Sequence, residues 1–306
     1  MPQGLFRHRH PVLTGLLVLG ALVLFFWGGI AFFVSRIMGP SQAELFAHEG
    51  IGIVELKGII VESEDVVRTL VEFREDDKVK AIVLRVDSPG GAVGASQEIH
   101  DEVLRTAKTK PVVASMGSVA ASGGLYASLG ATKVMANAGT MTGSMGVILK
   151  FANLEGLFQK VGYRSEVVKS GKLKDIGSSD RPMTEEERKM LQGLIDSVHD
   201  QFVQAAVSGR SLPEEKVRAF ADGRVFSGQQ AKEFGLVDQL GNFTDAVMLA
   251  ATLAGMSTDK LPELLYPSQK KFSILGLLTG EQGESLLRKT IFSGPVPAYE
   301  WTGSLR

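Results

Sequence analysis

The sequence SMGSVAASGGLY, residues 115–126, is the stretch around which the rest of the chain is organised. It follows a short apolar run at 111–114 that predicts a buried strand, and its small residues allow tight packing where a helix begins. Ser122 lies among Ala and Gly, so a bulky substrate can approach its hydroxyl, and the backbone N–H of Gly123 can face the same point. Taken alone, the stretch also fits a small-residue helix start packed against a neighbouring element, so its interpretation depends on the rest of the chain.

A second glycine-containing loop, Asp87-Ser88-Pro89-Gly90-Gly91, follows an apolar, β-branched strand predicted at 81–86 and precedes a helix predicted at 92–108. The two glycines let the backbone turn sharply and leave amides uncovered near the helix N-terminus, where developing negative charge is favoured. A strand-to-helix turn of this kind needs no function. Two loops whose amides converge on one carbonyl oxygen, however, resemble an oxyanion hole.

Strands alternate with helices from residue 51 onward, which indicates an α/β domain with largely parallel strand pairing. After Lys169 the pattern becomes helical, with a capping box at Thr184 and a second helix start at Ser227. The further expected elements are a strand pair at 51–61 around Lys57-Gly58, strands at 133–136, 146–149 and 164–168, and helices at about 63–74, 184–209, 227–235 and 244–253.

The composition excludes few classes of protein. The chain has 306 residues, of which 44% are hydrophobic and 22% charged, with a net charge of −1. This length suffices for one or two domains with a full core. Because no basic run is interleaved with aromatic residues, nucleic acid is not expected as a partner. The absence of cysteine fits an oxidising compartment in which no disulfides form.

An uncharged run from Val12 to Val34 predicts an N-terminal transmembrane helix. At about 1.5 Å per residue it is long enough to cross a hydrocarbon core of about 30 Å. A cleaved signal peptide is the alternative, but the apolar run exceeds the usual signal-peptide core and no A-x-A cleavage site follows. Because Arg7 and Arg9 precede the run and only Arg36 follows nearby, the positive-inside rule places the N-terminus in the cytoplasm and the remainder outside.

A serine nucleophile requires a general base, and the sequence offers histidine or lysine. No local pattern links Ser122 to the histidines, which are His8, His10, His48, His100 and His199. The loop KSGKLKDI at 169–176 carries Lys169, Lys172 and Lys174. A lysine base must be neutral, so burial has to lower its pKa from about 10.4 to near 7. A solvated basic loop is the alternative, and the residues alone do not decide which lysine is buried.

Five motifs, taken together, resemble those of the bacterial signal peptide peptidase A family. They are DSPGG (87–91), SMGSVAASGGLYAS (115–128), TGSMGV (142–147), SGKLKDIGS (170–178) and DGRVFSGQQAKEFGLVDQLG (222–241), in the family's order between about Gly52 and Met256. The resemblance implies that Ser122 is the nucleophile and that Lys174, the lysine before Asp-Ile, is the general base. It also implies that Ser144 orients the lysine amine and that the amides of Gly91 and Gly123 form the oxyanion hole.

The fold implied by the resemblance is the one shared by the Clp protease subunit and the crotonases, an α/β fold of repeated β-β-α units, here behind one N-terminal transmembrane helix. A single copy of each motif is typical of the family's single-unit form, which assembles into homo-oligomeric rings where the lysine reaches the serine of a neighbouring subunit. The expected segments are a cytoplasmic N-terminus at 1–11, the anchor at 12–34, a linker at 35–50, the peptidase domain at 51–267 and a tail at 268–306 that matches the family least.

The function implied is that of a serine endopeptidase in the bacterial inner membrane, with its catalytic domain in the periplasm or otherwise outside the cytoplasm. Its substrates would be residual signal peptides and other short apolar peptides, and it would need no metal ion or other cofactor. Two alternatives keep the fold. A crotonase-like acyl-CoA enzyme is disfavoured by the anchor, because CoA thioesters are cytosolic. A catalytically silent membrane scaffold is disfavoured by the presence of both Ser122 and Lys174.

Overall fold

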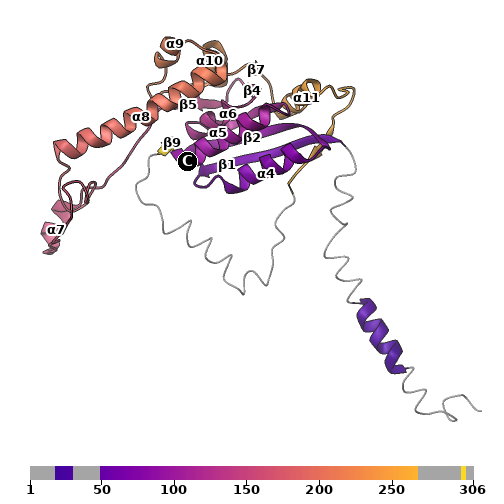
Figure 1. The fold of residues 1–306 in the computed structure, drawn as a ribbon, viewed down its shortest axis with the longest axis horizontal. Helices are drawn as coiled ribbons and strands as arrows, with labels where there is room; N and C mark the ends of the chain where they lie inside the picture. The colour runs from indigo at the N-terminus through magenta and orange to yellow at the C-terminus, as the bar shows by residue number, and fades with distance from the viewer. Residues whose placement is uncertain (1–17, 30–48, 268–297, 301–306) are drawn as a thin grey trace, which may run out of the picture. The chain divides into compact units, whose positions relative to one another are not determined.

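The computed structural model describes residues 18–29, 49–267 and 298–300 (Figure 1). The chain divides into two compact units, Met1–His48 and Glu49–Arg306. In the first unit the described residues 18–29 form a helix with exposed side chains. The predicted N-terminus at 1–11, much of the anchor, nearly all of the linker and most of the tail lie outside the described residues. Within the described part, no helix has the length and apolar character needed to pass through a bilayer.

One mixed sheet forms the centre of the second unit. Its three long strands, β1 (Gly50–Ile60), β2 (Val79–Ala92) and β3 (Val112–Ala121), pair in parallel. The described short strands are β4 (Lys133–Ala136), β5 (Met141–Gly143), β6 (Val225–Ser227), β7 (Gln239–Leu240), β8 (Glu263–Leu265) and β9 (Ala298–Glu300). The strand order is β6-β5-β3-β2-β1-β8, while β4 pairs with β3 and β7, and β9 pairs with β2.

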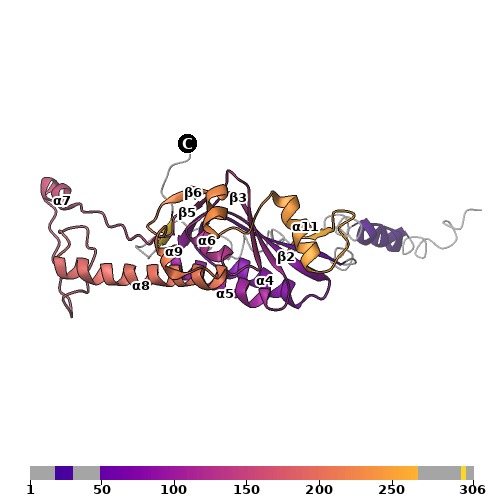
Figure 2. The same cartoon turned by 90° about the horizontal axis from the view of Figure 1, so that it is seen from above.

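Helices cover both faces of this sheet (Figure 2). They are α4 (Glu64–Glu75), α5 (Val93–Ala107), α6 (Gly123–Ser128), α7 (Glu155–Val161), α8 (Glu185–Arg210), α9 (Glu214–Arg218), α10 (Gly228–Phe234) and α11 (Phe243–Leu253). On one face, Ala246, Val247, Ala250 and Ala251 of α11 join a core cluster with Ile51, Ile53 and Val83. On the other face, Gly52 lies against α4, where an added Cβ would be 2.6 Å from the Phe73 ring. Because successive side chains of a strand alternate between two covered faces, the central strands contain consecutive buried apolar residues, as at 81–84 of β2 and 112–114 of β3.

The longest helix, α8, extends from the sheet to the region that contains α7 (Figure 1). A capping box between Thr184 and Glu187 starts it. Near its other end Phe202 is fully buried and packs edge-on against the Tyr126 ring of α6, with ring centroids 5.0 Å apart. In its first half the apolar side chain of Leu194 is 42% exposed. Only the second half of α8 therefore contributes to the core of the described chain.

Most expected elements are present, and three of the expectations about strands, at 51–61, 146–149 and 164–168, are wrong. The capping boxes at Thr184 and Ser227 and the strand at 133–136 are confirmed. The region 51–61 is one strand instead of a strand pair, because Gly58, with a φ of 71°, produces only a register shift inside β1. Residues 146–149 and 164–168 do not form strands, and the second of these segments is exposed.

Replacement of Phe202 by Ala tests the contact between α8 and α6. We expect the free energy of unfolding to fall by about 3–5 kcal/mol, because the substitution leaves a cavity in a fully buried site. Ser208→Ala, at an exposed position of the same helix, is the control and should change stability by less than about 0.5 kcal/mol. Denaturant titration measures both values, and equal effects would contradict the packing described here.

Candidate active site

The predicted nucleophile, Ser122, occupies a sharp turn between β3 and α6. Its φ of 55° and ψ of −117° form a conformation that residues other than glycine rarely adopt. Such a conformation costs about 1–3 kcal/mol and persists only where the surrounding structure holds it. Here the Ser122 N–H donates to the Gly143 carbonyl at 2.8 Å, and the Tyr126 N–H donates to the Ser122 carbonyl at 2.8 Å. Strained strand-to-helix turns of this kind carry the serine nucleophile in α/β-hydrolases.

The hydroxyl of Ser122 is buried without a partner. The side chain is 0% exposed, and Oγ makes no hydrogen bond with any described residue. Within the described part, Arg210 Nε is the one other buried side-chain polar atom in this state. An unpaired buried polar group costs about 1–3 kcal/mol, so such groups are rare and call for an explanation. The unpaired Ser122 Oγ is explained if its hydrogen-bond acceptor comes from outside the described residues.

The backbones of Gly91 and of Gly123, the residue that follows Ser122, approach each other. A Cβ added to Gly123 would lie 3.3 Å from the Gly91 nitrogen and 2.4 Å from Ser96 Oγ. A Cβ added to Gly91 would lie 2.0 Å from the Ile60 carbonyl oxygen. Neither position has room for a side chain, so the two loops meet at backbone distance. Gly123 is also the first residue of α6, where an N–H has no partner within the helix.

The loop 87–91 is the end of β2 and not the predicted strand-to-helix turn. Two of its side chains, to which sequence analysis gave no role, hold it in place. Ser88 Oγ donates to the Gly58 carbonyl at 2.6 Å and accepts from the Gly90 N–H at 3.1 Å. Asp87 Oδ1 accepts from the Val119 N–H at 3.1 Å. The available signal was the residue type, because Ser and Asp commonly bond to nearby backbone in irregular segments.

Ser144 lies next to Ser122 across the sheet. Ala121 of β3 and Gly143 of β5 are register partners, so each serine directly follows a paired residue. Ser144 is buried, has a φ of 52°, and donates its N–H to the Arg224 carbonyl at 2.8 Å. The register therefore brings a second hydroxyl-bearing residue to the end of the sheet that carries the candidate nucleophile.

The three lysines of the loop 169–176 have different surroundings. Lys169 Nζ pairs with Asp175 at 2.5 Å, and Lys172 Nζ lies 3.6 Å from Glu186. Lys174 is exposed, and its side chain makes no hydrogen bond or ion pair within residues 49–267. Of the three, Lys174 is thus the lysine whose amine is not already engaged in this part of the chain.

Within one chain, the lysine loop and Ser122 are far apart. The loop lies at the first turn of α8, as the pair between Lys172 and Glu186 requires. Ser122 lies at the other end of the helix, where Phe202 contacts Tyr126. The helix between Glu186 and Phe202 is about 24 Å long, which a lysine side chain cannot span. The structure brings Ser122, Ser144, Gly91 and Gly123 together and leaves Lys174 apart.

The two described histidines have other partners. His100 Nδ1 lies 3.0 Å from Asp101, and His199 Nε2 lies 2.7 Å from the Ala221 carbonyl. Neither is hydrogen-bonded to Ser122 Oγ. The described residues contain no group of three His, Cys, Asp or Glu side chains that could hold a metal ion.

Strand β9 runs along the part of β2 that contains Gly91. The pairing is antiparallel, with Gly90 opposite Glu300, Gly91 opposite Tyr299 and Ala92 opposite Ala298. Sequence analysis assigned no role to the tail, because a three-residue strand far along the chain from its partner has no local pattern. An extended segment can therefore pair with the backbone beside the Gly91 amide.

Comparison with known proteins identifies the family. The sequence model of peptidase family S49 matches residues 105–257, and that of the Clp protease matches residues 53–150. The chain belongs to peptidase family S49. The Clp protease match covers the part of the chain that forms β1, β2 and β3, so this S49 member has a Clp protease-like α/β domain.

Three relatives support the assignment. A protein of Synechocystis sp. named as a protease is 52% identical over 187 residues, which are 61% of this chain and 68% of that protein. Serine protease SPPA, chloroplastic, of Arabidopsis thaliana is 32% identical over 248 residues, 81% of this chain and 35% of that protein. An Enterococcus faecium protein named as a signal peptide peptidase is 41% identical over 179 residues, 58% of this chain and 52% of that protein. The chain thus spans about a third and a half of the last two, and as an S49 member it is a serine peptidase.

Gly123→Ala tests the convergence of the two loops in this peptidase. The added methyl group would displace either Ser96 or the Gly91 backbone, so we expect kcat/KM to fall by about 10²–10³-fold, as for loss of one oxyanion-hole donor. Gly94→Ala is the matched control, because a Cβ at Gly94 meets no atom within 4 Å. Peptide hydrolysis assays on both variants measure the effect, and wild-type activity of Gly123→Ala would exclude the convergence.

Proposed function

We propose that this chain is a membrane-anchored serine endopeptidase that cleaves residual signal peptides and other short apolar peptides with a Ser122–Lys174 dyad. The observation that carries the proposal is the buried, unpartnered Oγ of Ser122 in a strained turn, beside the backbones of Gly91 and Gly123. A nucleophilic hydroxyl needs a base within hydrogen-bond reach and donors aimed at the oxyanion. In this proposal the Gly91 and Gly123 amides are the donors, and the base comes from outside the immediate surroundings of Ser122, where Oγ has no hydrogen-bond partner.

In the proposed reaction, the neutral amine of Lys174 accepts the proton of the Ser122 hydroxyl as Oγ attacks the peptide carbonyl. The amides of Gly91 and Gly123 donate to the oxyanion of the tetrahedral intermediate, which collapses to an acyl-enzyme as the protonated lysine returns its proton to the leaving amine. Water then attacks the ester by the same route, with Lys174 again as the base. Ser144 orients the lysine amine through its hydroxyl.

The lysine is supplied by a neighbouring subunit in a ring-shaped homo-oligomer. Two observations support this arrangement: about 24 Å of α8 separates the lysine loop from the turn at Ser122, and Lys174 has no side-chain partner among the described residues of its own chain. A Ser122 hydroxyl without an acceptor and a Lys174 amine without a partner are complementary groups, and assembly would bring them together.

The run at 12–34 is proposed to anchor the ring in the bacterial inner membrane. It carries no charged residue, and at about 1.5 Å per residue it would span about 35 Å as a helix. Arg7 and Arg9 before it would keep the N-terminus in the cytoplasm and the catalytic domain outside. Apolar peptides concentrate at membranes, so an anchored ring would lie beside its substrates.

The substrate is proposed to bind as an extended strand along residues 90–92 of β2. The antiparallel pairing of β9 with these residues supports this mode, because it aligns an extended segment with the Gly91 backbone. Recognition through main-chain hydrogen bonds is independent of side-chain identity, as in other cases of strand addition. A peptidase that clears many different short peptides requires such tolerance.

Mixing of two inactive variants tests the dyad and its subunit arrangement. Ser122→Ala and Lys174→Ala should each abolish hydrolysis of a synthetic signal peptide, whereas Lys169→Ala and Lys172→Ala should retain it. If the two inactive proteins exchange subunits at equal amounts, about a quarter of the interfaces join an intact serine to an intact lysine. We therefore expect recovery of about a quarter of wild-type activity.

Activity in Lys174→Ala would refute the dyad. Loss of activity in Lys172→Ala alone would show that Lys172, and not Lys174, is the base. Failure to recover activity, with subunit exchange demonstrated by mass spectrometry, would place both residues in one subunit.

Removal of residues 298–306 tests the peptide-binding edge. If β9 and substrate pair with the same residues of β2, the truncated enzyme should bind peptides more tightly, with a KM several-fold lower and a similar kcat. Removal of 301–306 alone keeps β9 and serves as the control. Equal KM values for the two truncated proteins would show that the substrate binds elsewhere.

A further inference from the structure

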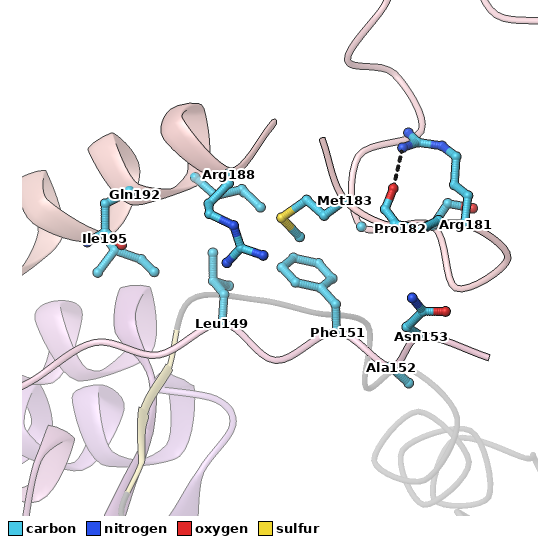
Figure 3. Close-up of a pocket in the computed structure, with 13 residues that line it drawn as sticks. Leu149, Phe151, Ala152, Asn153, Arg181, Pro182, Met183, Arg188, Gln192 and Ile195 are labelled. Atoms are coloured by element: carbon cyan, nitrogen blue, oxygen red, sulfur yellow. Dashed lines mark hydrogen bonds between the residues drawn. The ribbon is translucent and has the colours of Figure 1, made fainter. Parts of the chain in front are cut away.

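Within the described part of the chain, Arg181 makes more side-chain hydrogen bonds than any other residue of the segment 169–184, which leads from the lysine loop to α8. Its guanidinium has five N–H groups in a planar fork, and the structure gives it five hydrogen bonds. Nε donates to Asp175 Oδ2 at 3.2 Å, Nη1 to Glu187 Oε2 at 3.0 Å and the Pro182 carbonyl at 3.1 Å, and Nη2 to Glu187 Oε1 at 2.5 Å and the Asp175 carbonyl at 3.3 Å. The bond to Pro182 is drawn in Figure 3.

These bonds join two parts of the chain with different roles. Asp175 directly follows Lys174. Arg181 donates hydrogen bonds to the carboxylate and to the backbone carbonyl of Asp175. Glu187 belongs to the first turn of α8, is 3% exposed at its side chain, and accepts from the Thr184 N–H at 2.8 Å in the capping box. Arg181 thus ties the backbone next to Lys174 to a buried carboxylate on the longest helix.

The charges in this cluster support one another. The hydrogen bond from Arg181 is the main cause that lowers the pKa of Asp175 to about 2, and the bond from Lys169 lowers it further. Arg181 is likewise the main cause that lowers the pKa of Glu187 to about 2. Depressed carboxylate pKa values mean that the cluster is fully formed above the ordinary values of 3.8 and 4.5 and is lost only as the pH falls toward 2. It therefore persists at every pH at which a lysine base can work.

We propose that Arg181 is a positioning residue for the peptidase reaction: it fixes the Lys174 backbone on α8 so that the lysine amine meets Ser122 of the neighbouring subunit in one geometry. This inference rests on the proposed function. A base carried on a loop outside the sheet has no strand to orient it, and a misplacement of about 1 Å can cost about 10²-fold in rate. The guanidinium of Arg181 holds the backbone beside Lys174 in place through its bonds to Asp175 and Glu187.

The chain offers a matched control in Arg188. Arg181 and Arg188 both line a pocket of about 490 Å³ between residues 149–153 and the start of α8. The guanidinium of Arg188 points toward Leu149 and Phe151 (Figure 3), and it makes no ion pair with a described residue. Replacement of Arg188 by Lys makes the same chemical change in the same region, loss of a guanidinium with the charge kept, and leaves the cluster of Arg181, Asp175 and Glu187 intact.

The experiment compares Arg181→Lys, Glu187→Gln and Arg188→Lys in the full chain, with peptide hydrolysis measured over a range of pH. A lysine cannot replace the fork, so we expect kcat/KM of Arg181→Lys to fall by about 10–10²-fold. Its pH–rate profile should also differ from that of the wild type, because the general base is no longer held in one geometry against Ser122. Glu187→Gln keeps the capping box, since Gln serves at this position, and should change in the same direction. Arg188→Lys should stay within about two-fold.

A second measurement separates positioning from a general structural role. The rate at which a fluorophosphonate probe labels Ser122 should fall in Arg181→Lys, and in the Lys174→Ala background the same substitution should add no further loss. A multiplicative loss, an unmoved pH profile, or a reduced assembly size by light scattering would overturn the role of Arg181. Wild-type activity of Arg181→Lys, together with an inactive Lys174→Ala, would also overturn the role of Arg181. Full activity of Lys174→Ala would instead refute the proposed dyad itself.

Discussion

The hydrogen bond from the Ser122 N–H to the Gly143 carbonyl is the contact on which the site depends. It closes the end of the β3–β5 pair and holds Ser122 in a conformation that its side chain disfavours. From that turn follow the start of α6 at Gly123, the approach of the Gly91 backbone and the position of Ser144. Small residues fill this region because backbone meets backbone there, and each added methyl group would displace a strand or a loop. The strained backbone of Ser122 is thus held by the hydrogen bonds and the strand pairing around it.

The parallel sheet and the long helix differ in how firmly they are held in the described chain. Sheet ends are rigid, since β1, β2 and β3 are tied together by backbone pairing and by the side chains of Ser88 and Asp87. They suit a hydroxyl and amides that must not move. The first half of α8, by contrast, carries apolar side chains that the described chain leaves uncovered, such as those of Met190 and Leu194. A surface of this kind is suited to contact with another subunit.

Local chemistry was predictable from the sequence, and long-range pairing was not. The strands at 81–86 and 133–136 were predictable because β-branched, apolar runs suit strands with both faces covered. The caps at Thr184 and Ser227 were predictable because each involves residues three apart. A bulge at Gly58 and a hairpin have the same local sequence, so only the neighbouring strand distinguishes them. The three lysines were indistinguishable for a similar reason: their surroundings depend on Asp175 and on the remote Glu186. The pairing of β9 with β2 joins residues about two hundred positions apart, which no window of sequence contains.

Under the proposed arrangement, the length of α8 would also affect how activity responds to the amount of enzyme. Under the proposed arrangement, a helix that keeps base and nucleophile apart in one chain makes turnover depend on association, so specific activity should fall on dilution below the dissociation constant of the ring. Confinement to a membrane would oppose that loss, because tethered subunits meet at a far higher effective concentration than free ones. A newly made subunit would then be harmless until enough copies had gathered in the same bilayer. If the proposed arrangement holds, proteolysis would start only above a threshold amount of the protein in the membrane, and the length of α8 would be the cause.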